Sequence, residues 1–188
     1  MQEKEKMLKG LPYLPEQDET LKNERIKCKK LCQEHNQLSP EKLDERKAIL
    51  KQILGSAKEN FLIEQPFVCD YGFNIEIGEN FYSNHNLTIL DCNKVIFGDN
   101  VFIGPNCSFY CTIHPIDIKH RNQGLETAQP ITVGNNVWFG GNVVVLPNVK
   151  IGNGVVIGAG SVVTKDIPDN SVAVGNPAKV ITEINQDE

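Results

Sequence analysis

Residues 133–168 read VGNNVW, FGGNVV, VLPNVK, IGNGVV, IGAGSV and VTKDIP when the chain is cut every six residues. The first position of every unit is apolar, and the fifth is apolar in all but one. The fourth is Asn, Gly or Asp, which tolerate a left-handed backbone at a tight corner. A period of six fits neither an α-helix nor an ordinary alternating strand. Each unit is therefore predicted to form one short strand and one corner, with three units per coil of a parallel β-helix.

The same repeat runs through the preceding part of the chain with interruptions. The spacing from Ile89 to Phe97 is eight residues, which predicts two extra residues bulging out near Asp91 and Cys92. Residues 115–130 lack the pattern, yet the repeat resumes after them in the same phase. We therefore predict that these residues form a loop that projects from one corner of a mainly β fold.

The N-terminal residues follow a helical pattern instead. One amphipathic helix is expected after a cap at Asp18, with an apolar face formed by Leu21, Cys28, Leu31, Cys32 and His35. A second is expected to start at Ser39-Pro40-Glu41, with Leu43, Leu50, Ile53, Leu54 and Ala57 on its apolar face. Helices this short are not stable alone, so we expect them to cover the N-terminal end of the β-helix. The chain then divides into a helical cap, 1–58, and a β-helix domain, 59–188, with its loop and C-terminal tail.

Composition limits the possible partners. The 188 residues carry a net charge of −5, and residues 59–188 hold 14 acidic and only 6 basic groups, which argues against nucleic-acid binding. No apolar run is long enough to span a membrane, and the start MQEKEKM is too charged for a secretory signal. We expect a cytoplasmic protein with no membrane partner.

The six cysteines include no pair with the Cys-x-x-Cys spacing of zinc or redox sites. Cys107 falls in an inward column of the repeat, and Cys28 and Cys32 fall on the apolar helical face. Buried free thiols in a reducing compartment are therefore the expected state, rather than disulfides or zinc ligands.

Several motifs have a recognisable order: CDYGFNIEIG, NFYSNHNLTILD, IHPID, RNQG, the hexapeptide run and VGNPAKVI. In this order they resemble the maltose and galactoside O-acetyltransferases of the hexapeptide-repeat superfamily, over nearly the whole chain. The resemblance implies a left-handed β-helix and a homotrimer with active sites between neighbouring subunits. It also implies direct acetyl transfer from acetyl-CoA, as co-substrate, to a hydroxyl of a sugar acceptor, with no metal required.

His114 is the candidate catalytic residue. Its position in the repeat places it outside the β-helix where the loop begins, and we expect Trp138, in the same column twenty-four residues later, to face the same flank. A neutral imidazole can accept the proton of an attacking hydroxyl, and the resemblance implies this role for His114. It further implies that Asp70 and Asn84 contact the sugar, and that Asp91 orients His114 or lies near the acceptor.

The resemblance also implies that coenzyme A lies along the C-terminal coils. Trp138 would pack against the pantetheine arm, and Gly141 and Ala159 would leave room for backbone hydrogen bonds. The phosphates would be bound by Thr164, Lys165 and Lys179. Lys179 stands where the family has an arginine, so it lacks the bidentate geometry of a guanidinium.

Three alternatives remain open at this point. Cys111, three residues before His114 in a column expected to face outward, would be the nucleophile of an acetyl-cysteine route. His85, His114 and His120 would supply the ligands of a carbonic-anhydrase-like zinc site. The third alternative is a non-catalytic trimeric scaffold. The sequence does not distinguish a maltose or glucose acceptor from a galactoside.

Overall fold

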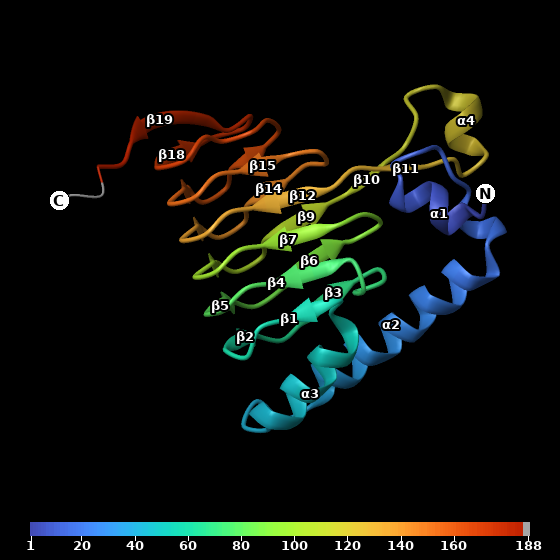
Figure 1. The fold of residues 1–188 in the computed structure, drawn as a ribbon, viewed down its shortest axis with the longest axis horizontal. Coiled ribbons are helices and arrows are strands. Elements are labelled where there is room, and N and C mark those ends of the chain that lie inside the picture. Colours follow the sequence, from blue (N-terminus) through green and yellow to red (C-terminus); the bar gives the residue numbers. More distant parts are fainter. Residues whose placement is uncertain (186–188) are drawn as a thin grey trace.

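The computed structural model describes residues 1–185. They form a parallel β-helix with helices against its N-terminal end and an extended loop at one edge (Figure 1). Successive strands turn through three faces, and each strand pairs in parallel with the strand one coil away on the same face. The predicted fold class, mainly β with an N-terminal helical cap and an extended loop, is confirmed.

Each face contains short strands that stack from coil to coil. Face 1 consists of β1 Ser56–Ala57, β4 Ile75–Ile77, β7 Val95–Phe97, β12 Ile131–Val133 and β15 Lys150–Ile151. Face 2 consists of β2 Phe61–Ile63, β5 Phe81–Ser83, β8 Phe102–Ile103, β13 Trp138–Phe139, β16 Val156–Ile157 and β18 Ser171–Val174. Face 3 consists of β3 Phe67–Cys69, β6 Leu87–Leu90, β9 Ser108–Tyr110, β14 Val144–Val145 and β17 Val162–Val163. The antiparallel strand β19, Lys179–Glu183, pairs with β18 and closes the C-terminal end.

The register shows that the coils differ in length. Leu62 pairs with Tyr82 and Tyr82 with Phe102, which are steps of 20 residues. Trp138 pairs with Val156, a step of 18, as three hexapeptides require. Phe102 pairs with Trp138, a step of 36, because one coil there carries the loop. Extra residues therefore leave the stacking of the strands intact.

Asparagines form the corners, as the repeat predicts. Within residues 1–185, the residues other than glycine with a positive φ are all asparagines: Asn80, Asn86, Asn100, Asn106, Asn136, Asn142, Asn148 and Asn170. The side-chain amide of Asn80 donates to Asn100, and that of Asn100 donates to Asn136, so the corners are bonded from coil to coil. Asp166, at the corresponding position of the last repeat, does not have a positive φ, which corrects the expectation for that unit.

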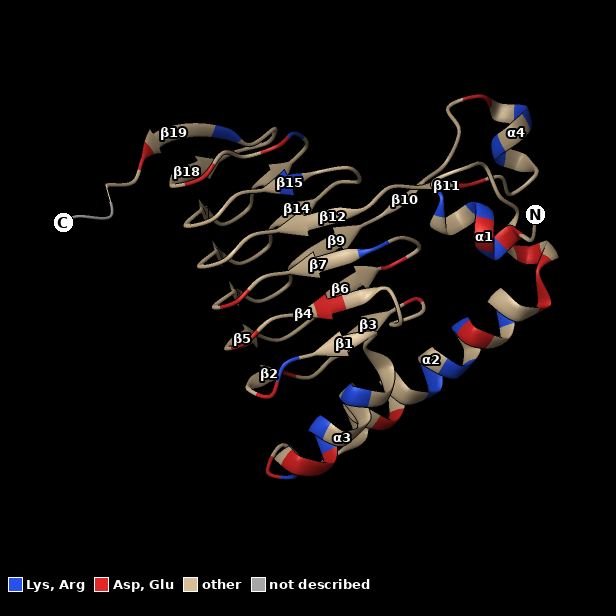
Figure 2. Cartoon of the chain, viewed as in Figure 1, with Lys and Arg blue, Asp and Glu red and all other residues tan. Residues whose placement is uncertain are grey.

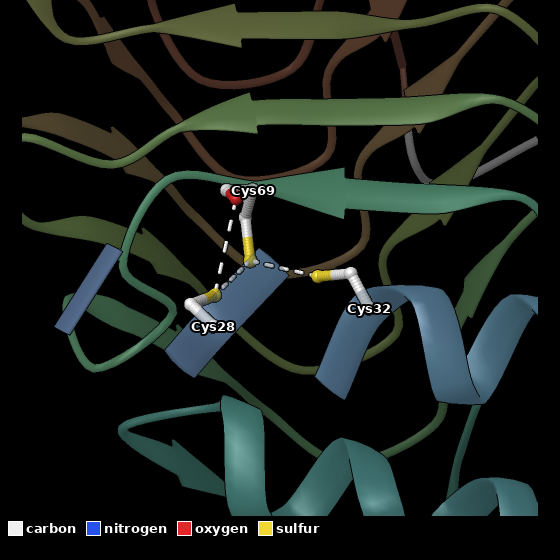
Figure 3. Close-up of side chains that lie close together, drawn as sticks. All are labelled: Cys28, Cys32 and Cys69. Carbon is white, nitrogen blue, oxygen red and sulfur yellow. Dashed lines mark hydrogen bonds between the residues drawn. The ribbon is translucent and has the colours of Figure 1, made fainter. Parts of the chain in front are cut away.

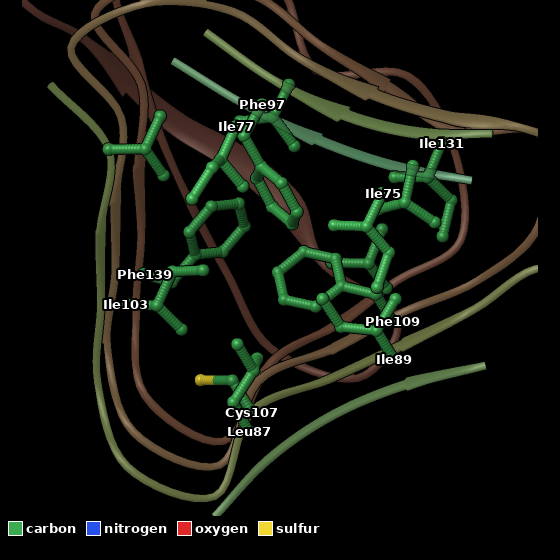
Figure 4. Close-up of a cluster of buried hydrophobic side chains, with 14 of the residues drawn as sticks. Ile75, Ile77, Leu87, Ile89, Phe97, Ile103, Cys107, Phe109, Ile131 and Phe139 are labelled. Carbon is green, nitrogen blue, oxygen red and sulfur yellow. The ribbon is translucent and has the colours of Figure 1, made fainter. Parts of the chain in front are cut away.

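The interior of the β-helix is packed with inward-facing aliphatic and aromatic side chains (Figure 4). Phe97 and Phe109 come from one coil, Phe81 from the coil before it and Phe139 from the coil after it, and these rings meet edge to face with centroids 5.0–5.3 Å apart. This is the arrangement that aromatic quadrupoles favour. The first and fifth columns of the repeat thus build one continuous core.

All three insertions occur at the same corner, where the chain passes from face 3 to face 1. Residues 70–74 connect β3 to β4, residues 91–94 connect β6 to β7, and residues 111–130 connect β9 to β12. The longest of these contains an antiparallel ribbon of β10, Thr112–Ile113, with β11, Thr127–Ala128, and a short helix α4, Ile118–Asn122. The insertions into the regular β-helix therefore all lie at this corner.

The two longer helices cover the first coil. Helix α2, Glu19–Gln37, begins at the predicted cap, where Asp18 accepts hydrogen bonds from the amides of Thr20 and Leu21. Helix α3, Leu43–Ile53, buries Ile49, Leu50 and Ile53 in the same core as the first strands. The predicted start of α3 at Pro40 is wrong, because residues 39–42 form a turn closed by a hydrogen bond from the Lys42 amide to the Ser39 carbonyl.

The first residues of the chain lie apart from α3, beside the loop (Figure 1). Helix α1, Glu3–Leu8, and the 3₁₀ turn η1, Pro15–Gln17, flank Tyr13, which forms a backbone bridge with Glu126. Met7, Tyr13 and Ala128 belong to a second small apolar cluster. The N-terminal segment therefore anchors the loop as well as leading into the cap.

Charged side chains are concentrated on the helices, and the strands carry few of them (Figure 2). No helix among the described residues combines the length and the apolar character needed to cross a membrane.

We expect Phe109→Ala to lower the free energy of unfolding by about 3–5 kcal/mol, since it removes a fully buried ring that touches two others. Ile26→Ala, on the outer side of α2 with 52% of its surface exposed, should change it by less than about 0.5 kcal/mol. Chemical denaturation followed by circular dichroism measures both. Equal effects of the two substitutions would show that the aromatic stack is not what stabilises the coils.

Candidate active site

His114 lies at the base of the loop, directly after β10. Pairing of β10 with β11 places Ile113 opposite Thr127, and therefore brings His114 close to Glu126. The imidazole Nε2 lies 3.9 Å from Glu126 Oε1, beyond hydrogen-bonding distance but within reach of an ion pair if the ring is protonated. About half of the His114 side chain is exposed, so its other edge is accessible to a substrate.

Glu126 is held on its other side by Tyr13. The Tyr13 hydroxyl donates to Glu126 Oε2 at 2.6 Å, and the two backbones exchange hydrogen bonds of 2.9 and 3.0 Å. Tyr13 is fully buried, and burial raises the pKa of its hydroxyl, which therefore stays a donor. This arrangement fixes a carboxylate behind the imidazole, where it can orient the ring and stabilise its charged form.

Asp70 lies at the first insertion of the same corner, residues 70–74. It is half-buried, and Cys92 Sγ donates to its Oδ2 at 3.7 Å. Burial raises the pKa of the Asp70 carboxyl, while the guanidinium of Arg25 on α2 acts in the opposite direction. A carboxyl partly shielded from water and close to an arginine can accept hydrogen bonds from substrate hydroxyls.

Asp91 does not line this space. It is fully buried, and its Oδ1 accepts hydrogen bonds from the amides of Asp70 and Tyr71 at 3.1 and 2.8 Å. Burial raises the pKa of its carboxyl to about 7. Of the extra residues predicted to bulge out here, Asp91 turns its carboxyl to the backbone amides of the neighbouring insertion, and Cys92 is buried in the second apolar cluster with Tyr13.

Trp138 and Asn84 lie on face 2, away from the His114 corner of the same chain. Trp138 is 56% exposed in β13, and together with Tyr82, Asn84 and Phe102 it lines a cavity of about 500 Å³. The expectation that Trp138 shares a flank with His114 is wrong within one chain. The coil between them is 36 residues long instead of 18, so eighteen of the twenty-four residues belong to the loop and the other six move the chain one face around the prism.

The remaining candidates lie along the C-terminal coils. Gly141 and Ala159 sit at the corner from face 2 to face 3, and their amides make no backbone hydrogen bond to another described residue. Thr164 and Lys165 are exposed after β17, and Lys179 is exposed at the start of β19. These positions offer free backbone donors and positive charge on the outer surface, without forming one enclosed pocket in a single chain.

Two of the alternative sites are not supported by the geometry. Cys111, expected to face outward, is fully buried, and burial raises the pKa of its thiol, so it is neither accessible nor activated as a nucleophile. His85, His114 and His120 do not form a cluster that could hold an ion within residues 1–185. His120 instead pairs with Asp117 on α4 at 2.6 Å.

The chain matches known acetyltransferases over its whole length. The model of the maltose acetyltransferase hexapeptide capping motif matches residues 6–58, and that of the bacterial transferase hexapeptide, with six repeats, matches residues 130–165. Galactoside O-acetyltransferase of Escherichia coli is 47% identical over 89% of this chain and 82% of its own. The chain belongs to the maltose and galactoside O-acetyltransferase family.

Solved structures of this family share the fold closely. The crystal structure of a maltose O-acetyltransferase from Clostridium difficile 630 is 49% identical, covers 99% of both chains and superposes with a TM-score of 0.95. A galactoside acetyltransferase in complex with coenzyme A is 44% identical, covers 100% of this chain and 93% of its own, and also has a TM-score of 0.95. The protein is therefore an acetyltransferase of this type, and the resemblance inferred from its motifs is confirmed.

Three residues of the candidate site in this acetyltransferase were missed from the sequence: Tyr13, Arg25 and Glu126. Tyr13 and Glu126 are 113 positions apart, and no spacing pattern connects them. Arg25 lies four residues after Leu21 and three before Cys28, so it falls on the apolar face of α2, and this spacing is the signal that could have found it. Only the packing of the N-terminal segment against the loop brings them together.

Asp91→Asn should change how stability depends on pH. With a folded-state pKa of about 7, against about 3.9 in an unfolded chain, the folded protein binds this proton more tightly. The stability contributed by the protonated carboxyl is complete below about pH 4 and is lost as the pH rises to 7, by up to about 1.4 kcal/mol per unit. Asparagine retains the Oδ1 acceptor and has no such proton to lose.

The stability of the variant relative to wild type should therefore increase between pH 5 and pH 7. Urea denaturation at several pH values measures the difference, with Asp99→Asn on an exposed corner as the matched control. Parallel curves for wild type and Asp91→Asn would mean that Asp91 is ionised throughout and would contradict the assignment.

Proposed function

We propose that this protein transfers the acetyl group of acetyl-CoA directly to a hydroxyl of a sugar of the maltose, glucose or galactoside type, with His114 as general base. The observation that carries the proposal is the accessible imidazole backed by Glu126, whose other oxygen is bound by Tyr13. A histidine oriented by a carboxylate is a common arrangement for removing a hydroxyl proton.

The reaction requires a base and a site that holds the two substrates together. His114 takes the acceptor proton as the hydroxyl oxygen forms a bond to the acetyl carbonyl carbon. The carbon–sulfur bond then breaks, and the proton passes from the imidazolium to the departing thiolate. The Glu126 carboxylate stabilises the imidazolium between these two transfers.

The acceptor is proposed to bind at the corner between α2 and the loop. Asp70 supplies a carboxyl acceptor and Arg25 a fixed donor, and both suit sugar hydroxyls. Asp91 acts indirectly in this proposal, because its carboxyl holds the backbone of Asp70 in place. The helical region 1–58 then contributes to acceptor binding as well as covering the β-helix.

We further propose that the protein is a homotrimer with its active sites between subunits. Within one chain, Asn84 and Trp138 occupy face 2, whereas His114 occupies the corner between faces 3 and 1. The exposed rings of Phe102 and Trp138, at 49% and 56%, leave an apolar surface on face 2 that a neighbouring subunit would cover. A threefold arrangement places face 2 of one subunit beside the His114 loop of the next.

Coenzyme A is proposed to lie along the C-terminal coils. The free amides of Gly141 and Ala159 would bind polar groups of the pantetheine arm, and Trp138 would pack against it. Thr164, Lys165 and Lys179 would bind the phosphates from the exposed surface. The coenzyme is a substrate here, and no step of the proposal uses a metal.

His114→Ala should reduce kcat for acetyl transfer by about 10²–10⁴-fold, because no other group can take the hydroxyl proton. His120→Ala, a histidine of the same loop that pairs only with Asp117, is the matched control and should retain wild-type activity. Release of coenzyme A from acetyl-CoA is measured with maltose, glucose and a thiogalactoside as acceptors. The rates of coenzyme A release with the three acceptors rank them as substrates.

Three results would contradict this proposal. Full activity of His114→Ala would show that His114 is not the general base. If the folded wild-type protein binds coenzyme A but acetylates none of the sugars, the acceptor belongs to another class. If it binds no coenzyme A, the alternative of a non-catalytic trimeric scaffold is favoured.

A mixing experiment tests the position of the active site between subunits. His114→Ala and Trp138→Ala trimers should each be nearly inactive at low acetyl-CoA concentration. If each site combines His114 of one subunit with Trp138 of the next, trimers reassembled from an equal mixture regain about a quarter of wild-type activity, since three quarters are mixed and each mixed trimer has one intact site. No recovery after reassembly would place both residues in the same subunit's site.

A further inference from the structure

Three cysteines from distant parts of the chain converge where the helical region meets the β-helix (Figure 3). Cys28 and Cys32 lie one turn apart on α2, and Cys69 ends β3. Cys69 Sγ is 3.4 Å from Cys28 Sγ and 3.8 Å from Cys32 Sγ, and all three sulfurs lie within 4.8 Å of one another. Each residue is at most 5% exposed and carries a free thiol.

These distances suit a shared metal ion. Zinc–sulfur bonds are about 2.3 Å long, so sulfurs bound to one ion lie about 3.8 Å apart in tetrahedral geometry and about 4.0 Å apart in trigonal geometry. The sulfur separations of 3.4 and 3.8 Å lie at or slightly below these values and the third is at most 4.8 Å, so the side chains need only small movements to bind an ion. Elsewhere in residues 1–185, no three His, Cys, Asp or Glu side chains approach one another this closely.

The cluster is buried but has a path to solvent. Cys32 and Cys69 line a cavity of about 580 Å³, which is also lined by Lys29 and Asp70. Three thiolates around a divalent ion carry a net charge of −1, which the ammonium group of Lys29 at the cavity would partly offset. One turn further along the same face of α2, His35 is fully buried, and its Nε2 has no hydrogen-bond partner among the described residues.

We propose that Cys28, Cys32 and Cys69 form a binding site for a thiophilic divalent ion of the zinc and cadmium type. Three sulfur–hydrogen bonds break, three metal–sulfur bonds form and the protons go to solvent, with no change in oxidation state. The fourth position of the ion faces the cavity. Sulfur ligands select ions of this class over magnesium, calcium and manganese.

The proposed ion would link two elements that also shape the candidate acceptor site. Cys69 directly precedes Asp70, and α2 carries both Cys28 and Arg25. An ion bound to all three sulfurs fixes α2 against β3 and thereby fixes the spacing between Asp70 and Arg25. This site is separate from the acetyl-transfer step and does not depend on it.

Cadmium is the probe for the test, because its thiolates absorb in the ultraviolet. Full-length protein, kept reduced with a phosphine, is titrated with Cd²⁺, and bound metal is measured by equilibrium dialysis. We expect one ion per chain, a thiolate-to-cadmium absorption band and a rise in Tm. Cys32→Ser and Cys69→Ser should each lose the band and bind at least about 100-fold more weakly, since outer-shell changes alone cost 10–100-fold.

Cys107→Ser is the matched control and should behave as wild type, because Cys107 is equally buried but donates to the Gly140 carbonyl, away from the cluster. Circular dichroism and gel filtration verify that each variant is folded. If only one of Cys32→Ser and Cys69→Ser folds, that variant alone is enough for the test. The absence of a thiolate band in wild type would overturn the proposal. Retention of the cadmium site in folded Cys32→Ser or Cys69→Ser would also overturn it, since the ion would then lie elsewhere, for instance at His114 and Glu126.

Discussion

The stacking of one coil on the next is the constraint on which the rest of this structure depends. Each strand hydrogen-bonds to the same face of the neighbouring coil, so the inward side chains must lie above one another, as Phe139 and Ile103 do. A residue inserted within a strand would turn every following side chain to the other side. Additions are tolerated only at corners, and all three lie at the corner from face 3 to face 1. The functional candidates His114, Glu126 and Asp70 all belong to these additions.

The strands and corners could be predicted because their information is local. A six-residue period with apolar residues at two columns and asparagine at the corner specifies a strand, its inward face and its turn without reference to distant residues. The same reasoning failed for Asp91, where the spacing predicts an outward bulge. The direction of its side chain is decided by the amides of Asp70 and Tyr71, which belong to another coil and need an acceptor.

The candidate site was less accessible to prediction from the residues alone. His114 could be singled out by its place at the start of the loop, but the carboxylate behind it could not, because the contact of Tyr13 with Glu126 joins the two ends of a long stretch of chain. Cys69 was likewise not connected with Cys28 and Cys32, since helical periodicity describes only the face of α2. Contacts between elements of different periodicity leave no pattern in the sequence.

A regular β-helix has a difficulty as an enzyme, because its three faces are flat and its interior is filled. The structure creates concave surface in two ways. Helix α2 packs beside the corner from face 3 to face 1 and forms the cavity next to Asp70, and the loop extends beyond the β-helix. Neither reaches Trp138, whose ring lies exposed on face 2. In the proposed arrangement, an acetyl donor along face 2 and an acceptor beside His114 meet only if a neighbouring copy brings the two surfaces together. The flatness of the fold is thus itself a physical reason for placing the active site between subunits.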